Sequence, residues 1–505
     1  GAVATGALTV TGDVVLNDGS PNLRINDTDT SRFIDVLYGT RVATFRNTMA
    51  SGEDMDTVEP SIVFSFKDDG ETRTAITIDH DANTIFSGDI RKSTAGTSNF
   101  AAGVNAGNSI TSGGNLNTVV GDEAGTAIST GVQNTLIGYQ SGRALNDADF
   151  NTVLGTNALA SDTKGSKSTA IGTQALNTQN FTSATNSHNT AVGHQAGLFL
   201  TTGTTNTLIG SQAGDAITTG SSHVAVGFGA LGANTTASNC VGIGYESLTN
   251  NTTGASNTAI GTYSLALNTT GASNFAAGYN ALGANTTGGS NVGIGFRALQ
   301  ANTTAGANTA VGESALKVNT TGTMNTGIGY HALITTTTGS YNTGVGQYPL
   351  RYNSTGTNNV GIGYITLMDN TTGSYNVAVG NNALENNTTA NHNTAVGHKA
   401  LFAVTTTGGN VAVGDYALYS NVASSNTAVG SDALIANTSG TRHVAVGAIA
   451  LDANTTGTRN TAIGYGALTA NTTGSYNTAV GDISLYVNST GGSNVAVGTC
   501  LLLHI

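Results

Sequence analysis

Aromatic side chains recur directly after a glycine at matching places in this sequence, and they are its best candidates for binding chemistry. An exposed aromatic ring can stack on the apolar face of a sugar ring or on another aromatic ring. Further rings stand one residue later, at Tyr263, Tyr348 and Tyr416. The sequence is compatible with two roles for these rings. They could contact glycans, or they could stack on one another and stiffen the chain. The candidate glycan contacts are Tyr139, Phe228, Tyr245, Tyr279, Phe296, Tyr330, Tyr364 and Tyr465.

Paired carboxylates are the second kind of candidate, because two acids flanking a glycosidic bond can hydrolyse it. A 16-residue interval shifts the register between the two members of the last pair named below. The acids are otherwise scattered, so we expect no catalytic residues and no enzyme. The pairs considered are Asp122/Glu123, Asp147/Asp149 and Asp415/Asp432.

Metal and cofactor sites have weaker support. In "IDHD" the residues Asp79, His80 and Asp81 alternate between faces, so only the two aspartates could share a metal. "GIGFRA", which begins at Gly293, matches a dinucleotide-binding pattern, but "GIGYHA" repeats it from Gly327 and no crossover helix follows. We expect no metal and no cofactor.

A repeat must position the aromatic and carboxylate candidates. The glycine of "AIG", called here the anchor glycine, recurs from Gly103 to Gly498, and 20 of the 23 intervals between its copies are 17 residues long. Gly makes up 69 of 505 residues and Pro only 3, while charged residues are 9%, well below the roughly 25% of globular domains. The chain is therefore expected to be a solenoid.

Each repeat predicts an all-β coil of strand, turn, strand and turn. Val or Ile stands just before the anchor glycine, as in Ile294 and Val311, and Leu stands four residues after it, as in Leu299 and Leu316. We expect both to form buried ladders inside a parallel β-solenoid of about 23 coils. Asn recurs four residues before and seven after the glycine, and stacked amides can hydrogen-bond along the axis.

The residue two before the anchor glycine is small where the array is regular, as in Ala259, Gly293 and Ala310. Such a ladder indicates close approach of another backbone, either across the coil or from a neighbouring chain. We favour a neighbouring chain, and so expect a homotrimer.

Composition divides the chain into three parts. Residues 1–95 hold 8 of the 17 Lys and Arg and 15 of the 29 Asp and Glu, and we expect them to form a small β-rich attachment domain. Residues 96–498 are the repeat array, and 499–505 form an apolar tail. The net charge of -12 argues against a nucleic-acid partner. The sequence contains no run of about 18 apolar residues, so we expect no membrane insertion.

One interval is 21 residues long, and its extra residues fall in "NTQNFTSATNSHN", residues 177–189. Insertions in solenoids form lateral loops on an exposed face. This loop is a second binding candidate.

The repeat, as in Asn393 to Gly397 with Leu401, resembles the shorter head repeats of trimeric autotransporter adhesins, which fold as parallel β-rolls wound into trimers. Its longer form resembles repeats in the tail fibres of marine bacteriophages. "ALTVTGDVVLNDGSPNLRINDT", residues 7–28, and residues 69–88 are similar to shaft segments of such fibres. The repeat resemblance covers residues 99–498.

The resemblance implies a homotrimeric tail-fibre shaft on a virion, attached through its N-terminal end to other virion or filament proteins and contacting cell-surface polysaccharide. The first alternative is a bacterial surface adhesin or extracellular filament subunit. It ranks below the tail fibre because the coiled-coil stalk and membrane domain of the adhesins are not recognisable in the sequence. A second alternative is an ice-binding solenoid, suggested by regular pairs such as Thr252-Thr253 and Thr269-Thr270. Adjacent residues of a strand point to opposite sides, which weakens that alternative.

Overall fold

The computed structural model describes residues 96–500 in full and the backbone of five strands nearer the N-terminus. By its contacts the chain divides into two compact units, Gly1–Arg91 and Lys92–Ile505. Asp79, His80, Asp81 and residues 501–505 of the apolar tail lie outside the described residues.

The N-terminal unit contains one antiparallel sheet of strands in chain order. A register shift between Phe64 and Ser65 marks a bulge in the β3–β4 pair. Each strand pairs in antiparallel fashion with the next strand along the chain, as in a meander. Its strands are β1 (Arg32–Tyr38), β2 (Arg41–Asn47), β3 (Ile62–Asp68), β4 (Glu71–Ile78) and β5 (Thr84–Phe86).

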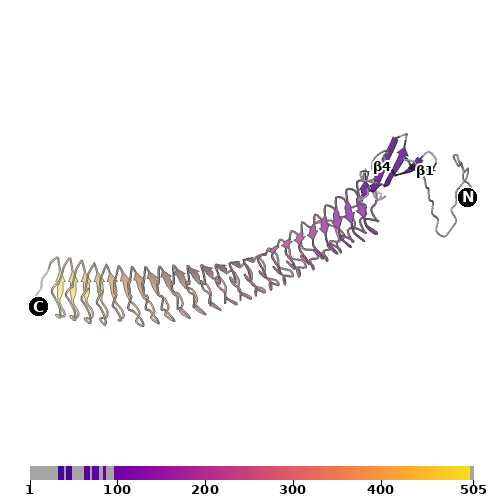
Figure 1. Ribbon diagram of the computed structural model, residues 1–505. Coiled ribbons are helices and arrows are strands. Elements are labelled where there is room, and N and C mark those ends of the chain that lie inside the picture. The colour runs from indigo at the N-terminus through magenta and orange to yellow at the C-terminus, as the bar shows by residue number, and fades with distance from the viewer. Residues whose placement is uncertain are drawn as a thin grey trace, which may run out of the picture. The chain divides into compact units, whose positions relative to one another are not determined.

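The second unit is a parallel β-solenoid of about 23 coils, stacked along one axis (Figure 1). Each coil adds one three-residue strand to a continuous parallel ladder in register, so the predicted fold class is confirmed. The ladder strands are β6 (Phe100–Ala102), β7 (Thr118–Val120), β8 (Thr135–Ile137), β9 (Thr152–Leu154), β11 (Thr169–Ile171), β13 (Thr190–Val192), β14 (Thr207–Ile209), β15 (Val224–Val226), β16 (Val241–Ile243), β17 (Thr258–Ile260), β18 (Phe275–Ala277), β19 (Val292–Ile294), β20 (Thr309–Val311), β21 (Thr326–Ile328), β22 (Thr343–Val345), β23 (Val360–Ile362), β24 (Val377–Val379), β25 (Thr394–Val396), β26 (Val411–Val413), β27 (Thr427–Val429), β28 (Val444–Val446), β29 (Thr461–Ile463), β30 (Thr478–Val480) and β31 (Val495–Val497).

The second strand expected in each coil is absent from the regular coils in the described part of the chain. Residues two, four and twelve after the anchor glycine have left-handed backbone conformations, as at Arg297, Leu299 and Ala307, and these interrupt an extended strand. Many of the remaining backbone groups still bond from coil to coil, for example Thr286 N–H to Thr303 C=O at 2.8 Å. Turns therefore complete each coil.

The anchor glycine ends each strand because no other residue fits there. Gly312 has φ +127°, and a Cβ on it would lie 2.6 Å from the carbonyl oxygen of Gly329 in the next coil. Both the conformation and the contact exclude a side chain. This explains why the glycine keeps the period.

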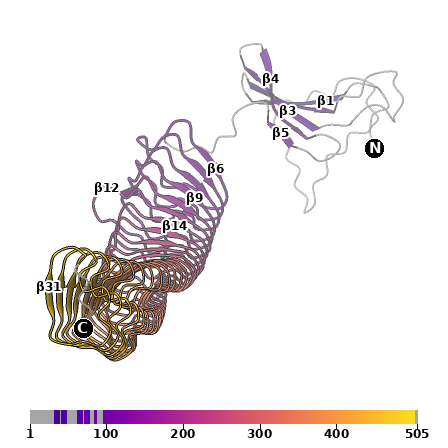
Figure 2. The same ribbon diagram turned by 90° about the vertical axis from the view of Figure 1, so that its left-hand side faces the viewer.

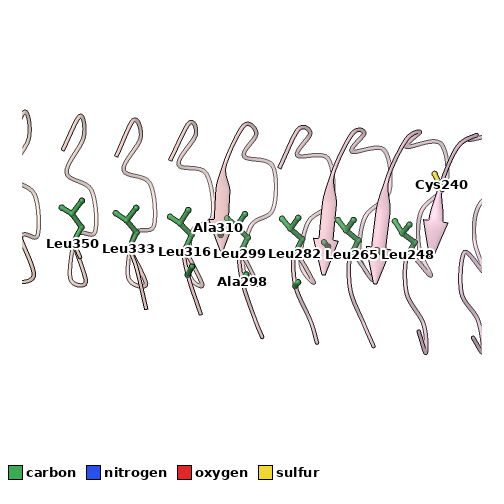
Figure 3. Packing of buried hydrophobic residues seen from close by; sticks show 14 of the residues in the cluster. Cys240, Leu248, Leu265, Leu282, Ala298, Leu299, Ala310, Leu316, Leu333 and Leu350 are labelled. Atoms are coloured by element: carbon green, nitrogen blue, oxygen red, sulfur yellow. The ribbon is translucent and has the colours of Figure 1, made fainter. Parts of the chain in front are cut away.

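The Leu ladder lies inside the coils, as predicted. Figure 3 shows Leu248, Leu265, Leu282 and their successors in a row, one per coil and pointing the same way. All have no exposed surface. Aligned leucines therefore form a continuous core along the axis.

The prediction that the Val/Ile ladder is buried is wrong. Ile294 is 37% exposed and Ile260 41%, while Val311 is half-buried. The strand residues alternate between faces as predicted, but the β-branched residues point outward. The interior is too narrow to hold them opposite the leucines.

The Ala/Gly ladder is the inward one, which corrects the expectation that it meets a neighbouring chain. Ala259 and Ala310 are fully buried within a single chain. A Cβ on Gly293 would lie 3.2 Å from Cγ of Leu282 in the preceding coil. The close approach is thus across the coil interior, between the strand and the Leu ladder.

Two buried Asn ladders stabilise the turns through hydrogen bonds. The backbone N–H of Asn274 donates to Oδ1 of Asn257 at 2.9 Å, and Nδ2 of Asn285 donates to Oδ1 of Asn268 at 2.7 Å. Nδ2 of both Asn274 and Asn285 also donates to the carbonyl of Gly288, each at 2.9 Å. Each coil therefore satisfies its buried amides partly within itself and partly against the previous coil.

The interior follows two arrangements. Leucine-turn coils have Leu four residues after the anchor glycine and almost always Asn seven after it; their anchors run from Gly227 to Gly481. Glycine-turn coils have Gly and then Ile or Leu at those two places, with anchors Gly103, Gly121, Gly138, Gly193 and Gly210. In most of the latter the inward strand residue is large, as at Leu136 and Leu208, both fully buried.

The coils anchored at Gly155 and Gly172 depart from both arrangements and carry the predicted insertion. Here β10 (Gly165–Ser166) pairs in parallel with β12 (Thr185–Asn186). Figure 2 shows β12 set apart from ladder strands such as β9 and β14. The fully buried Asp162 accepts hydrogen bonds from Nε2 of Gln179 at 2.6 Å and from the N–H of Phe181 at 3.1 Å.

Candidate functional site

The eight predicted aromatics all lie on the outside of the solenoid, at the bend that follows each ladder strand. Their exposed fractions range from 39% for Tyr330 to 55% for Tyr465. Since the anchor glycine fixes the backbone of this bend, every ring starts from an equivalent place. The structure thus presents one aromatic corner, made of Tyr139, Phe228, Tyr245, Tyr279, Phe296, Tyr330, Tyr364 and Tyr465.

Five rings on consecutive coils stack continuously, and we call them the ring ladder. Centroid distances are 5.5 Å for Phe228–Tyr245, 5.5 Å for Tyr245–Tyr263, 6.3 Å for Tyr263–Tyr279 and 5.6 Å for Tyr279–Phe296. The first and last pairs are parallel and the middle two edge-on. The rings therefore contact one another and solvent at the same time.

A second ring cluster carries positive charge. Tyr330 stacks on His331 at 3.9 Å and meets Tyr348 edge-on at 5.3 Å. The guanidinium of Arg351 lies 4.8 Å from the Tyr348 ring centre. Burial and the neighbouring Tyr348 raise the pKa of Tyr330, in that order of effect.

The other candidate rings have no aromatic neighbour at the same place on the adjacent coils. They are Tyr139, Tyr364 and Tyr465. Tyr416 belongs to a separate cluster, with His398 at 5.0 Å and Tyr419 at 5.4 Å.

A second exposed row was missed by sequence reasoning. Tyr341, Tyr375 and Tyr476 stand five residues before an anchor glycine and are 54%, 55% and 54% exposed. Tyr375 stacks on His392 of the next coil at 5.1 Å. The common register of these tyrosines was a signal available in the sequence.

Beside Phe228 lies a recess of about 290 Å³ that spans three coils. It exists because Gly229 and Gly232 stand where neighbouring coils carry larger side chains, and Asp215 and Glu246 lie at its walls. Burial raises the pKa of Asp215, against the opposing effect of backbone N–H groups. Hydrogen bonding and charge from Glu246 raise the pKa of Tyr245.

The carboxylate candidates are held in local contacts. Asp147 pairs with Lys164 at 3.5 Å, and Asp415 pairs with His398 at 2.9 Å. Asp149 accepts a hydrogen bond from the N–H of Val132 at 2.8 Å. Among the described residues, no three His, Cys, Asp or Glu gather as metal ligands would, and no helix is long and apolar enough to cross a membrane.

The lateral loop is anchored at its base and exposed at its tip. Asn189 Nδ2 donates to Gln179 Oε1 at 2.9 Å, and Phe181 is buried. Thr182, Ser183 and Ala184 are exposed.

The threonine pairs divide between two roles. Thr269 Oγ1 donates to the Thr286 carbonyl at 3.1 Å, and Thr286 Oγ1 to the Thr303 carbonyl at 3.1 Å. Thr270 and its equivalents are exposed. One rank of hydroxyls thus links the coils, which leaves a single outward rank.

Comparison of the chain with models of protein families, with curated proteins and with solved structures found no match.

Proposed function

We propose that this chain is a structural fibre protein: a homotrimeric β-solenoid shaft, part of a phage tail fibre, that carries a receptor-binding surface away from the particle. The observation that supports this most is the outward sheet face. Val, Ile and Thr side chains make up most of it from β7 to β31, and many of the Val and Ile are exposed by more than a third. Monomeric proteins rarely expose contiguous apolar surface on this scale, and two further copies of the chain would cover it.

Native mass by light scattering after size-exclusion chromatography tests the trimer. We expect three times 50.4 kDa for the unmodified chain. Replacing Ile294, Ile328 and Ile362 together by Asp should give a folded monomer, because charges cannot be buried unpaired in an apolar interface. The matched control is Asp at Thr270, Thr287 and Thr304, which are exposed on another face. A monomeric mass for the unmodified chain would refute the trimer.

The receptor-binding surface in this proposal is the aromatic corner, and its partner is a cell-surface polysaccharide. The exposed rings of the ring ladder, with successive centroids 5.5 to 6.3 Å apart, offer several stacking platforms to an extended sugar chain. Weak contacts repeated in this way bind through avidity. Replacing Tyr245 and Tyr279 by Ala should weaken binding to a polysaccharide panel, with Tyr476→Ala as the control outside the corner.

The virion location follows from the same proposal and has its own test. Antibodies to the chain should label purified phage particles in electron micrographs, with other virion proteins at the N-terminal end. Labelling of the bacterial surface instead would favour an adhesin or extracellular filament.

A further inference from the structure

Four consecutive coils carry one basic side chain each on the aromatic corner. Arg297 and His331 stand two residues after their anchor glycines, and Lys317 and Arg351 stand five after theirs. The backbone brings these two places together, as the N–H of Gln300 donates to the carbonyl of Arg297 at 3.3 Å. We call Arg297, Lys317, His331 and Arg351 the basic corner.

This concentration of positive charge is unusual in the chain. Residues 96–505 contain nine Lys and Arg, and three of them fall between positions 297 and 351, where Glu313 is the only acid. Within residues 96–500, no ion pair joins these three cations to a carboxylate. They are therefore free to pair with an anion from outside.

Aromatic rings support the cations. The Arg297 guanidinium lies 4.8 Å from the Phe296 ring centre, and that of Arg351 lies 4.8 Å from Tyr348 and 5.2 Å from Tyr352. Stacking of this kind leaves the edge N–H groups of a guanidinium available. Nε of Arg297 and Nδ1 of His331 are buried without a hydrogen-bond partner.

Positive charge predominates at His331. Burial lowers the pKa of His331 most, Arg351 and Lys317 lower it further, and Glu313 only partly opposes them. Cations on neighbouring coils thus act on one another despite a net charge of -12 for the whole chain.

We propose that the basic corner binds an acidic polysaccharide, one whose sugar rings carry carboxylates, extended along the solenoid axis. The proposal rests on the glycan contact proposed above and adds its chemical class and place. Carboxylates suit the guanidinium groups, and the apolar faces of the sugars suit Phe296, Tyr330 and Tyr352, which are exposed. A single-stranded nucleic acid fits less well, because its affinity grows with the number of phosphates neutralised and only three permanent cations are present.

The test compares polygalacturonate with its fully methyl-esterified form, using biolayer interferometry on the full chain. Both probes have the same sugar rings, but only the first is charged. We expect polygalacturonate to bind more tightly and to lose affinity as NaCl is raised. Combined Arg297→Gln, Lys317→Gln and Arg351→Gln should weaken it about tenfold or more. The control is Arg459→Gln, whose guanidinium lies over the Tyr476 ring at 5.1 Å, outside the basic corner.

The outcomes separate this inference from the proposed function. Equal binding of the two probes would overturn the acidic class while glycan contact stands. Unchanged affinity in the triple variant would overturn the location, and tighter binding of oligothymidylate would replace the polysaccharide by nucleic acid. Failure to bind any saccharide in the panel would remove both proposals. The ester and salt comparisons use the unmodified chain, so they decide even where the triple variant folds poorly.

Discussion

Glycine-turn and leucine-turn coils follow the same backbone path with different interiors. In a glycine-turn coil the apolar volume comes from the strand and from the residue seven after the anchor, as with Leu136 and Leu145. In a leucine-turn coil it comes from the turn, as with Leu316, and the strand residue shrinks to Ala or Gly. The filled volume is conserved although its source moves, as close packing requires.

The comparison also shows where strain is accepted. Gly142 has φ +54°, which glycine adopts freely, while Leu316 has φ +50° at the equivalent place. A left-handed conformation costs a non-glycine residue about 1–2 kcal/mol. Full burial of a leucine contributes about 1.5–3 kcal/mol, which offsets that cost.

Where the two kinds of coil meet, the interior fits poorly. Asn234 is the first Asn of its ladder and follows Ile217, so it has no amide behind it. Its Oδ1 and Nδ2 are both buried without a partner. His223, Cys240 and the recess beside Phe228 belong to the same short stretch.

The largest expected effect is Leu316→Ala, which empties a leucine-turn coil. Its interior holds no other large side chain, so the loss should lower the free energy of unfolding by about 3–5 kcal/mol. Guanidinium unfolding followed by circular dichroism measures it. Leu267→Ala is the control, since Leu267 is 50% exposed. If Leu316→Ala lowered the free energy of unfolding by less than 1 kcal/mol, the leucine-turn interior would not be packed as closely as the glycine-turn interior.

Gly142→Ala should be the next largest and tests the glycine-turn interior. A Cβ there would lie 2.8 Å from Leu145 Cδ1 and 2.9 Å from Leu136 Cδ2, so overpacking should cost about 1–3 kcal/mol. The cost should shrink when Leu145→Ala is added, because the crowding atom is then absent. Additive losses in the double variant would point to backbone strain instead.

Asn→Leu substitutions should have opposite signs in the ladder and at its end. Asn302 donates to Asn285 Oδ1 at 2.8 Å and accepts from Asn319 at 3.0 Å, so Asn302→Leu leaves buried partners unsatisfied and should cost about 1–3 kcal/mol. Asn234→Leu removes two orphaned atoms and should stabilise by about 1 kcal/mol. The same unfolding assay compares them, and destabilisation by both would show that Asn234 has a partner in solution.

His443 should make stability depend weakly on pH. It replaces an Asn: its Nδ1 accepts the N–H of Asn460 at 3.2 Å and its Nε2 lies 2.7 Å from the Gly457 carbonyl, which requires a neutral ring. Burial lowers its pKa, against those backbone bonds. The unfolded chain therefore binds the proton first, and stability present above about pH 6.5 should fall as the pH drops toward the folded-state pKa.

His443→Asn restores the residue that other coils use and should flatten this dependence at that coil. Melting temperatures at pH 7.5 and pH 5 compare the two proteins, with His188→Asn, at an exposed position of the lateral loop, as control. Equal pH dependence of all three would rule out a contribution from His443.

Much of the aromatic corner was predictable, because a ring that follows the anchor glycine must recur at one bend. Which of its rings stack depends on side-chain directions over successive coils. Tyr263 fills the gap between Tyr245 and Tyr279 from one residue further along. The recess could not be foreseen, since it arises where Gly229 and Gly232 happen to lie between Asp215 and Glu246 on adjacent coils.

The sequence by itself determined the period, the parallel stacking, the buried Leu ladder, the hydrogen bonding of stacked Asn side chains along the axis and the sets of residues that share a face. All of these follow from repetition and alternation along the chain. Only the tertiary structure decided which strand face points inward. Alternation is symmetric between the two faces, whereas the interior width is set by the opposing Leu282 and its equivalents, which leave room for Ala or Gly and turn Ile294 to the outside.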